Sequence, residues 1–193
     1  MSLRHQPKAA LINDFSGFGR CSVTVALPII SQMKVQCCPV LTSVFSNHTG
    51  YPSFYFDDYT EKMPSYIAEW KKLNLHFECI AAGFLGSERQ IEIVKNFIRD
   101  FKDETTKVLI DPVMGDHGRT YQTFTPEMCS QMKQLAHFAD ILTPNLTEAC
   151  ILTDTPYHDG HWQMSELSKL ALSLIAMGPS LSLIHISEPT RRR

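Results

Sequence analysis

The feature that most constrains the fold is a regular alternation of short apolar segments with longer segments of helical spacing. Apolar runs of this length suit buried strands. Strands that alternate with helices form mainly parallel sheets covered on both faces, with right-handed crossovers. The sequence therefore predicts an α/β fold. The expected strands lie at residues 9–12, 37–44, 77–82, 107–111 and 139–142.

Capping residues mark where the intervening helices should begin. The expected starts are Ser22 after a glycine turn at 16–19, Ser87 with Gln90 three residues later as a capping box, Thr125 before Pro126, and Asn145. The first of these helices should run to about Met33, and a last helix over 164–177 should end at Gly178.

Composition excludes several classes of protein. The 193 residues are 44% hydrophobic and 20% charged, with a formal net charge of -2, as in an ordinary globular domain. This charge gives no reason to expect a nucleic-acid or membrane-surface partner. No secretion signal and no apolar run near the about 20 residues of a membrane span is seen, so we expect a cytoplasmic protein. The six cysteines include no C-x-x-C pair, which argues against a metal clip.

Polar residues follow the predicted strands. They comprise Asn13 and Asp14, residues 46–49, Asp111, and residues 143–145. Ligands of parallel sheets bind beyond the carboxyl ends of the strands. These positions are therefore the candidate site.

Two of these segments contain carboxylate side chains. Asp111 and Asp116 lie five residues apart in Asp-Pro-Val-Met-Gly-Asp, which suits a hydrated Mg²⁺ that also binds phosphate oxygens. A turn capped by Asp111 would look the same. Thr143-Pro-Asn-Leu-Thr-Glu148 could likewise be only a helix cap, with Glu148 favoured by the helix dipole.

Five segments in one order are far more specific than any of them alone. They read Ser-Gly-Phe-Gly at 16–19, Phe-Ser-Asn-His-Thr-Gly-Tyr at 45–51, Gly-Phe-Leu-Gly-Ser at 83–87, Asp-Pro-Val-Met-Gly-Asp at 111–116 and Thr-Pro-Asn-Leu-Thr-Glu at 143–148. Over residues 9 to about 179 the chain resembles the pyridoxal kinases of the ribokinase superfamily. The resemblance implies a three-layer α/β/α fold, incomplete at its C-terminal end.

The resemblance also implies an activity in vitamin B6 salvage. Family members transfer the γ-phosphoryl group of ATP to the 5′-hydroxymethyl of pyridoxal, pyridoxamine or pyridoxine, usually as homodimers. By motif, Thr49 would contact the pyridine substrate, Asn13 or Asp14 would replace a family serine near the ring, and Phe84 would lie against the ring.

The same resemblance assigns the nucleotide side. Asp111 and Asn145 would lie near the ATP phosphates, Asp116 and Glu148 would hold Mg²⁺ directly or through water, and Thr143 would supply an oxygen to K⁺ or Na⁺. Phosphoryl transfer needs such positioning and charge neutralisation more than covalent chemistry.

One motif of the family does not occur. Its Gly-Thr-Gly-Asp segment provides the anion hole and the catalytic base, and the 193 residues contain no such segment. We therefore expect no catalytic residue and no kinase activity in the chain as written. The alternatives are a hydroxymethylpyrimidine kinase of thiamine synthesis on the same fold, and a non-catalytic vitamin-binding protein.

The last residues differ in character from the rest. Residues 181–191 can be back-translated to a transposase-end adaptor of sequencing libraries, and two more arginines follow. We expect residues 1–180 to be part of one kinase domain and 181–193 to be a non-native tail. The alternative is a native strand over 181–186 with a basic tail.

Overall fold

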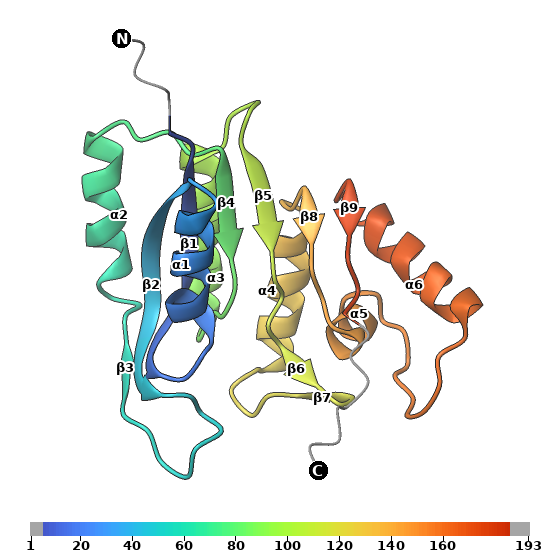
Figure 1. The fold of residues 1–193 in the computed structure, drawn as a ribbon. Helices are drawn as coiled ribbons and strands as arrows, with labels where there is room; N and C mark the ends of the chain where they lie inside the picture. Colours follow the sequence, from blue (N-terminus) through green and yellow to red (C-terminus); the bar gives the residue numbers. More distant parts are fainter. Residues whose placement is uncertain (1–5, 186–193) are drawn as a thin grey trace. The chain divides into compact units, whose positions relative to one another are not determined.

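A computed structural model describes residues 6–185 of the chain. The chain forms two compact units that divide after Val108, and Figure 1 colours and labels their elements along the sequence. The first unit contains the substrate-side candidates and the second contains the nucleotide-side candidates.

The sheet of the first unit is mainly parallel. β1 (Lys8–Phe18) pairs in parallel with β2 (Gln36–Asn47) on one side and with β4 (Cys79–Ala82) on the other. The short β3 (Phe56–Asp58) adds to β2 in the antiparallel direction. β5 (Lys107–Ile110) begins in this unit and ends in the next.

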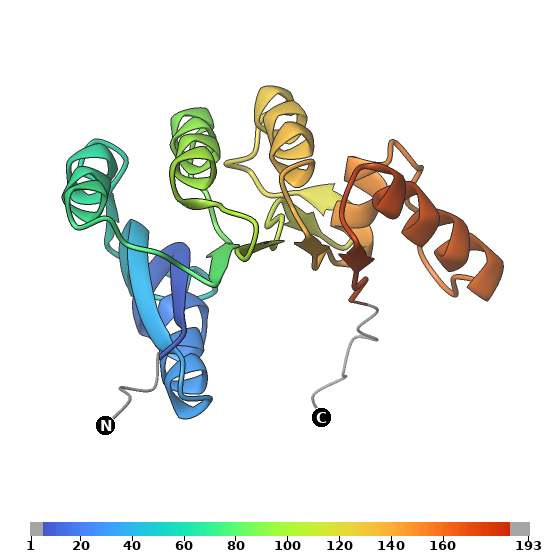
Figure 2. The same cartoon turned by 90° about the horizontal axis from the view of Figure 1, so that it is seen from above.

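Helices cover both faces of this sheet. α1 (Ser22–Gln32) lies on one face, and α2 (Met63–Lys72) and α3 (Glu88–Phe101) lie on the other, as Figure 2 shows. The predicted α/β fold with a mainly parallel sheet between helices is thus confirmed.

The core under α2 and α3 is aromatic. The ring of Phe77 lies 5.4 Å from that of Trp70 and 5.5 Å from that of Phe101, and Phe97 and Phe101 are 4.5 Å apart. The predicted helical stripe of α3 is buried as expected, including Ile91 and Val94.

The start of α1 differs from the prediction. Residues 16–18 continue β1 instead of forming a turn, because the strand passes a register shift between Asn13 and Phe15 and stays paired with β2. Cys21 is the N-cap, and it makes no side-chain capping bond. The Ser22 hydroxyl instead donates to the Asp14 carboxylate at 2.5 Å, so it serves β1 and not the helix.

The predicted capping box at α3 is half correct. Ser87 Oγ accepts from the Gln90 amide at 3.2 Å, but Gln90 Oε1 accepts from Gly86 N at 2.7 Å. The side-chain Nε2 of Gln90 donates to Thr42 O and to Thr60 Oγ1, each at 2.8 Å. Gln90 is buried, so its side chain ties α3 to β2 and to the loop before α2.

Replacing Gln90 with methionine should therefore lower the free energy of unfolding by about 2 kcal/mol, since buried groups on β2 and at Gly86 lose their partner. Urea denaturation followed by circular dichroism measures the change. The matched control is Gln122→Met at an exposed position, for which we expect less than about 0.5 kcal/mol. Equal effects of the two substitutions would contradict the role given to Gln90.

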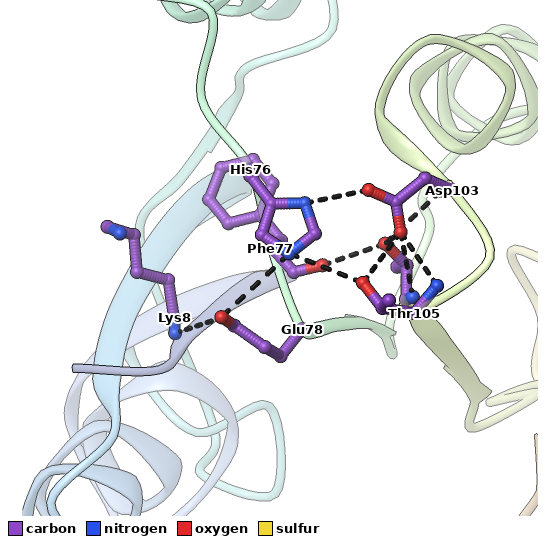
Figure 3. Close-up of polar contacts among 7 residues, drawn as sticks. Lys8, His76, Phe77, Glu78, Asp103 and Thr105 are labelled. Carbon is purple, nitrogen blue, oxygen red and sulfur yellow. Dashed lines mark hydrogen bonds and ion pairs between the residues drawn. The ribbon is translucent and has the colours of Figure 1, made fainter. Parts of the chain in front are cut away.

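A polar cluster ties the start of β4 to neighbouring segments of the first unit (Figure 3). His76 Nδ1 lies 2.9 Å from an Asp103 oxygen and His76 Nε2 lies 3.8 Å from a Glu78 oxygen. Glu78 also accepts from the Lys8 amide at 2.6 Å. Hydrogen bonds from Thr105, followed by the charge of His76, lower the pKa of Asp103 to about 2.

The second unit contains two sets of paired strands. β5 pairs in parallel with β8 (Ile141–Leu142), and β8 pairs in parallel with β9 (Leu181–Ser182). β6 (Gly115–Asp116) and β7 (Arg119–Thr120) form a separate hairpin that the sequence did not predict. The helices of the second unit are α4 (Pro126–Ala136), α5 (Leu146–Leu152) and α6 (Met164–Ala176).

The predicted helix starts in this unit are confirmed. Thr125 Oγ1 accepts from Met128 N at 3.1 Å, with Pro126 in the first turn of α4. Asn145 caps α5 in a reciprocal capping box with Glu148. Gly178 follows the last helix with a φ of +128°, one residue beyond the C-cap at Met177.

The tail is described only in part. Leu181 and Ser182 form β9, and His185 bridges to Asn145. Residues 186–193 lie outside the described part of the chain. The adaptor interpretation stays a prediction, which the sequence of the parent gene tests.

Within residues 6–185 no helix is long and apolar enough to cross a membrane. All six cysteines lie in this range and carry free thiols. Cys37 and Cys38 are half-buried on β2, where burial raises the pKa of both thiols.

Candidate functional site

In the first unit the structure brings Asn13 and Phe84 together. Asn13 Oδ1 accepts from the Phe84 amide at 3.0 Å and from the Asp14 amide at 3.0 Å. A Cβ at Gly83 would lie 2.6 Å from Asn13 Nδ2, so only glycine allows this close approach. The end of β4 is thereby fixed against β1.

Asp14 is buried and points to a different set of partners. Its carboxylate accepts from Ser22 Oγ at 2.5 Å and from Ser16 Oγ at 3.2 Å. Both oxygens are thus engaged by hydroxyl groups of its own neighbourhood. Neither Asn13 nor Asp14 ends the strand, because β1 continues to Phe18.

Thr49 lies on an exposed turn directly after β2. The turn is held to the end of β1 by His48 N, which donates to Phe18 O at 2.9 Å, and it is closed by Gly50 N, which donates to His48 Nδ1 at 3.0 Å. His48 is therefore a structural residue of this turn, and it presents Thr49 to solvent beside β1.

The Phe84 ring contacts a small aromatic cluster through Phe45. Phe45 at the end of β2 lies 6.1 Å from the Phe84 ring in an edge-on arrangement, and it also contacts the rings of Phe54 and Phe56. Phe84 was predicted from the sequence, but this cluster was not. Its members alternate along the chain from Phe54 to Phe56, which is the signal that could have revealed it.

In the second unit the β6–β7 hairpin is attached to the start of α5. Asn145 Nδ2 donates to Gly115 O at 2.8 Å, and Thr147 Oγ1 accepts from Gly118 N at 2.9 Å. Glu148 Oε1 accepts from Met114 N at 3.1 Å. Three residues at one helix start thus hold the hairpin that carries Asp116.

Glu148 is the most strongly perturbed acid of this cluster. Its side chain is only 3% exposed, and burial raises its pKa to about 7. Hydrogen bonds from the amides of Asn145 and Met114 oppose the increase, whereas the negative charge of Asp111 adds to it. Burial likewise raises the pKa of Asp111, against the charge of His185 and a hydrogen bond with Thr143.

Tyr121 shows that the predicted acids share one neighbourhood. This residue was not predicted from the sequence, and its backbone amide donates to Met114 O at 2.9 Å. Burial raises the pKa of its hydroxyl, and the charges of Glu148, Asp116 and Asp111 raise it further. Asp116 itself is exposed on β6, where its carboxylate accepts from the His117 amide at 2.8 Å.

Within the described residues, no three or more His, Cys, Asp or Glu side chains gather in a way that could hold a metal by themselves. Two acids of the second unit, Asp111 and Glu148, instead form a partly buried like-charge pair, with Thr143 and Asn145 beside it. Repulsion between two partly buried carboxylates is relieved by a proton or by a cation.

Solved structures resemble this chain closely. The crystal structure with pyridoxal of a Bacteroides thetaiotaomicron protein, described as a phosphomethylpyrimidine kinase, is 47% identical with a TM-score of 0.89, over 93% of this chain and 63% of that one. Pyridoxal kinase from Lactobacillus plantarum is 27% identical with a TM-score of 0.84, over 96% of this chain and 66% of that one.

A curated relative shows the same similarity to pyridoxal kinases. The pyridoxal kinase of Arabidopsis thaliana is 29% identical over 160 residues, which cover 76% of this chain and 51% of that protein. The chain thus spans about half the length of this relative. The family model for phosphomethylpyrimidine kinase matches residues 27–188. With that match over most of its length, the chain belongs to the phosphomethylpyrimidine kinase family, on the ribokinase-like fold that pyridoxal kinases share.

Proposed function

We propose that this chain is part of a pyridoxal kinase, which transfers the γ-phosphoryl group of ATP to the 5′-hydroxymethyl of a vitamin B6 vitamer. The observation that carries the proposal is the Phe-Ser-Asn-His-Thr-Gly-Tyr segment at 45–51, whose turn presents Thr49 next to the end of β1. The 47% identity with a protein whose crystal contains pyridoxal supports the same substrate.

On the substrate side, Asn13 is the better candidate of the two residues that could replace the family serine. Its side-chain Oδ1 accepts from the backbone amide of Phe84, whereas the Asp14 carboxylate accepts from the hydroxyls of Ser16 and Ser22. Phe84 would offer its ring to the pyridine, held in place by the edge of Phe45. Thr49 would supply a hydroxyl from the exposed turn.

On the nucleotide side, the surroundings of Glu148 suit a divalent cation. Burial and the Asp111 charge keep the pKa of Glu148 near 7, so a nearby cation would favour the charged form of its carboxylate. Asp116 and Glu148 would hold Mg²⁺, directly or through water, and Thr143 would offer an oxygen to K⁺ or Na⁺. The metal supplies neutralisation of phosphate charge.

Asp111 and Asn145 would lie near the ATP phosphates. The Asn145 amide already caps α5 and holds Gly115 O, which leaves one N–H of its amide group for a phosphate oxygen. Its proposed role is therefore to fix the hairpin and to contact the nucleotide from the same position.

The base that activates the substrate hydroxyl is not assigned to any residue here, because the sequence contains no Gly-Thr-Gly-Asp segment. We assign the phosphoryl transfer to the parent protein, which we propose to be a cytoplasmic homodimer, and the vitamer and phosphate contacts to this chain.

A second candidate is a hydroxymethylpyrimidine kinase. The family model and the name of the Bacteroides thetaiotaomicron relative both favour it. The two activities share a fold and differ in the ring that is bound, so substrate comparison separates them.

The test is a side-by-side assay of the parent protein with ATP and each substrate. We expect kcat/KM for pyridoxal to exceed that for hydroxymethylpyrimidine by about 100-fold, roughly 3 kcal/mol of discrimination by polar contacts to the ring. Thr49→Val should lower kcat/KM for pyridoxal about tenfold without loss of stability, since Thr49 is exposed. A preference for hydroxymethylpyrimidine would refute the pyridoxal proposal in favour of the second candidate.

A further inference from the structure

A cavity of about 540 Å³ lies within the second unit. One face of α4, one face of α5 and the segment that follows α5 form its walls. Its volume is within the range of small-molecule sites. None of the roles proposed above for the kinase reaction uses it.

The cavity contains one positive charge that is more enclosed than its partner. Lys133 Nζ lies 2.5 Å from an Asp154 oxygen, and the two side chains are 27% and 84% exposed. The ammonium is thus part of the wall, whereas the carboxylate projects into solvent. An ion pair with one such exposed partner adds little stability, so another anion can replace it.

The rest of the wall is suited to an apolar group. Pro126 on α4, Ile151 on α5 and Pro156 after α5 line the cavity together with the thiols of Cys129 and Cys150. Burial raises the pKa of Cys129 and the charge of Lys133 opposes this change, which places the ammonium near that thiol. A ligand that fits must combine one anionic group with a compact apolar body.

We propose that this cavity binds a small organic carboxylate with a flat apolar body, whose carboxylate replaces Asp154 as the partner of Lys133. The body lies between Pro126 and Pro156, over Ile151. This is a second ligand site, separate from the proposed substrate and nucleotide positions, and it does not depend on the proposed kinase activity.

The site also touches the support of the β6–β7 hairpin. Thr147, which accepts from Gly118 N at 2.9 Å, lines the cavity, and so does Tyr157. The Tyr157 ring lies so close to Gly118 that a Cβ there would be 2.4 Å from it. An occupant therefore contacts two side chains that lie against Gly118 of the hairpin, and it should slow hydrogen exchange of the Gly118 amide.

Benzoate is the probe, titrated into the 193-residue chain and followed by amide chemical shifts. We expect saturable shifts at residues of α4, α5 and the segment after α5, with benzamide, the neutral analogue, causing none. Lys133→Met should weaken benzoate binding about tenfold, as the loss of one charge-assisted contact predicts. Asp154→Asn should strengthen it about threefold, since the competing carboxylate is gone.

The two substitutions are matched to the structure. Asp154 has a φ of +54°, a left-handed conformation that asparagine tolerates, so Asp154→Asn keeps the turn. Both residues are on the surface, and unchanged circular dichroism verifies folding. Opposite effects of the two variants on benzoate affinity support the proposal. No saturable shifts, or equal binding of benzamide, or no difference between the variants, would overturn it.

An independent readout is the reactivity of Cys129. Benzoate should protect this thiol from iodoacetamide about threefold at saturation, as read by mass spectrometry, and should not protect the half-buried Cys79 of the first unit. Equal alkylation of Cys129 with and without benzoate would contradict the site.

Discussion

Replacing Gly115 with alanine is expected to lower the free energy of unfolding of the second unit by about 3 kcal/mol. A Cβ at this position would lie 2.2 Å from Arg119 O and 2.8 Å from Thr120 Cα, both backbone atoms that cannot move aside alone. The hairpin must open, and the hydrogen bonds that Asn145 and Thr147 make to it are lost, at about 1 kcal/mol each with the β6–β7 pairing.

Urea denaturation followed by far-ultraviolet circular dichroism measures this effect. Gly86→Ala is the matched control, because a Cβ there meets only ordinary contacts at 3.7 Å or more and no positive φ is involved. The control should change stability by less than about 1 kcal/mol. If Gly115→Ala were as mild as Gly86→Ala, the close backbone approach in the hairpin would be wrong.

The stability of the second unit should fall by up to about 3 kcal/mol as the pH rises from 4.5 to 8, owing to Glu148 alone. Burial raises the pKa of this carboxyl from its usual 4.5 to about 7 in the folded protein. The folded state therefore binds the proton more tightly than the unfolded state. The stabilising contribution is complete below pH 4.5 and is lost as the pH passes through 7.

The measurement compares urea unfolding from pH 4.5 to 8 for the unsubstituted chain and for Glu148→Gln. Glutamine has nearly the same shape and stays neutral, so the variant should lack this part of the pH dependence. Glu127→Gln, an exposed acid on α4, serves as the control and should keep it. Parallel pH profiles for the unsubstituted chain and Glu148→Gln would show that Glu148 does not titrate in this range.

Mg²⁺ extends the same experiment to the proposed metal site. A cation near Glu148 favours its charged form, so saturating Mg²⁺ should flatten the pH profile of the unsubstituted chain and leave that of Glu148→Gln unchanged. A pH profile of stability that Mg²⁺ does not alter would count against metal binding at Glu148.

Much of the fold could be predicted because hydrophobic period and capping chemistry are local. The α3 stripe, the Thr125 cap and the Asn145 cap each depend on residues within one or two turns, and all are confirmed. Strand ends were less predictable. β1 extends past Asp14 because pairing with β2, far along the chain, outweighs the local turn preference of residues 16–19.

The site residues show the same division. That Glu148 belongs to a helix start is readable from Thr-Pro-Asn-Leu-Thr-Glu, but its burial and raised pKa depend on the hairpin that folds over it. The hairpin itself has strands of two residues with no apolar alternation, so no sequence period marks it. Serine commonly caps helices, but the hydroxyl of Ser22 donates to the buried Asp14 carboxylate instead.

The short antiparallel β3 has a consequence for how this protein behaves at high concentration. Its three residues include Asp57 and Asp58, with Asp57 paired to Lys62 at 2.9 Å. A brief, charged border strand offers too few free backbone groups for another chain to add to, and its carboxylates repel one that tries. β3 therefore covers the edge of β2 at Ser43, Val44 and Phe45, and there it opposes fibril-like self-association through this strand.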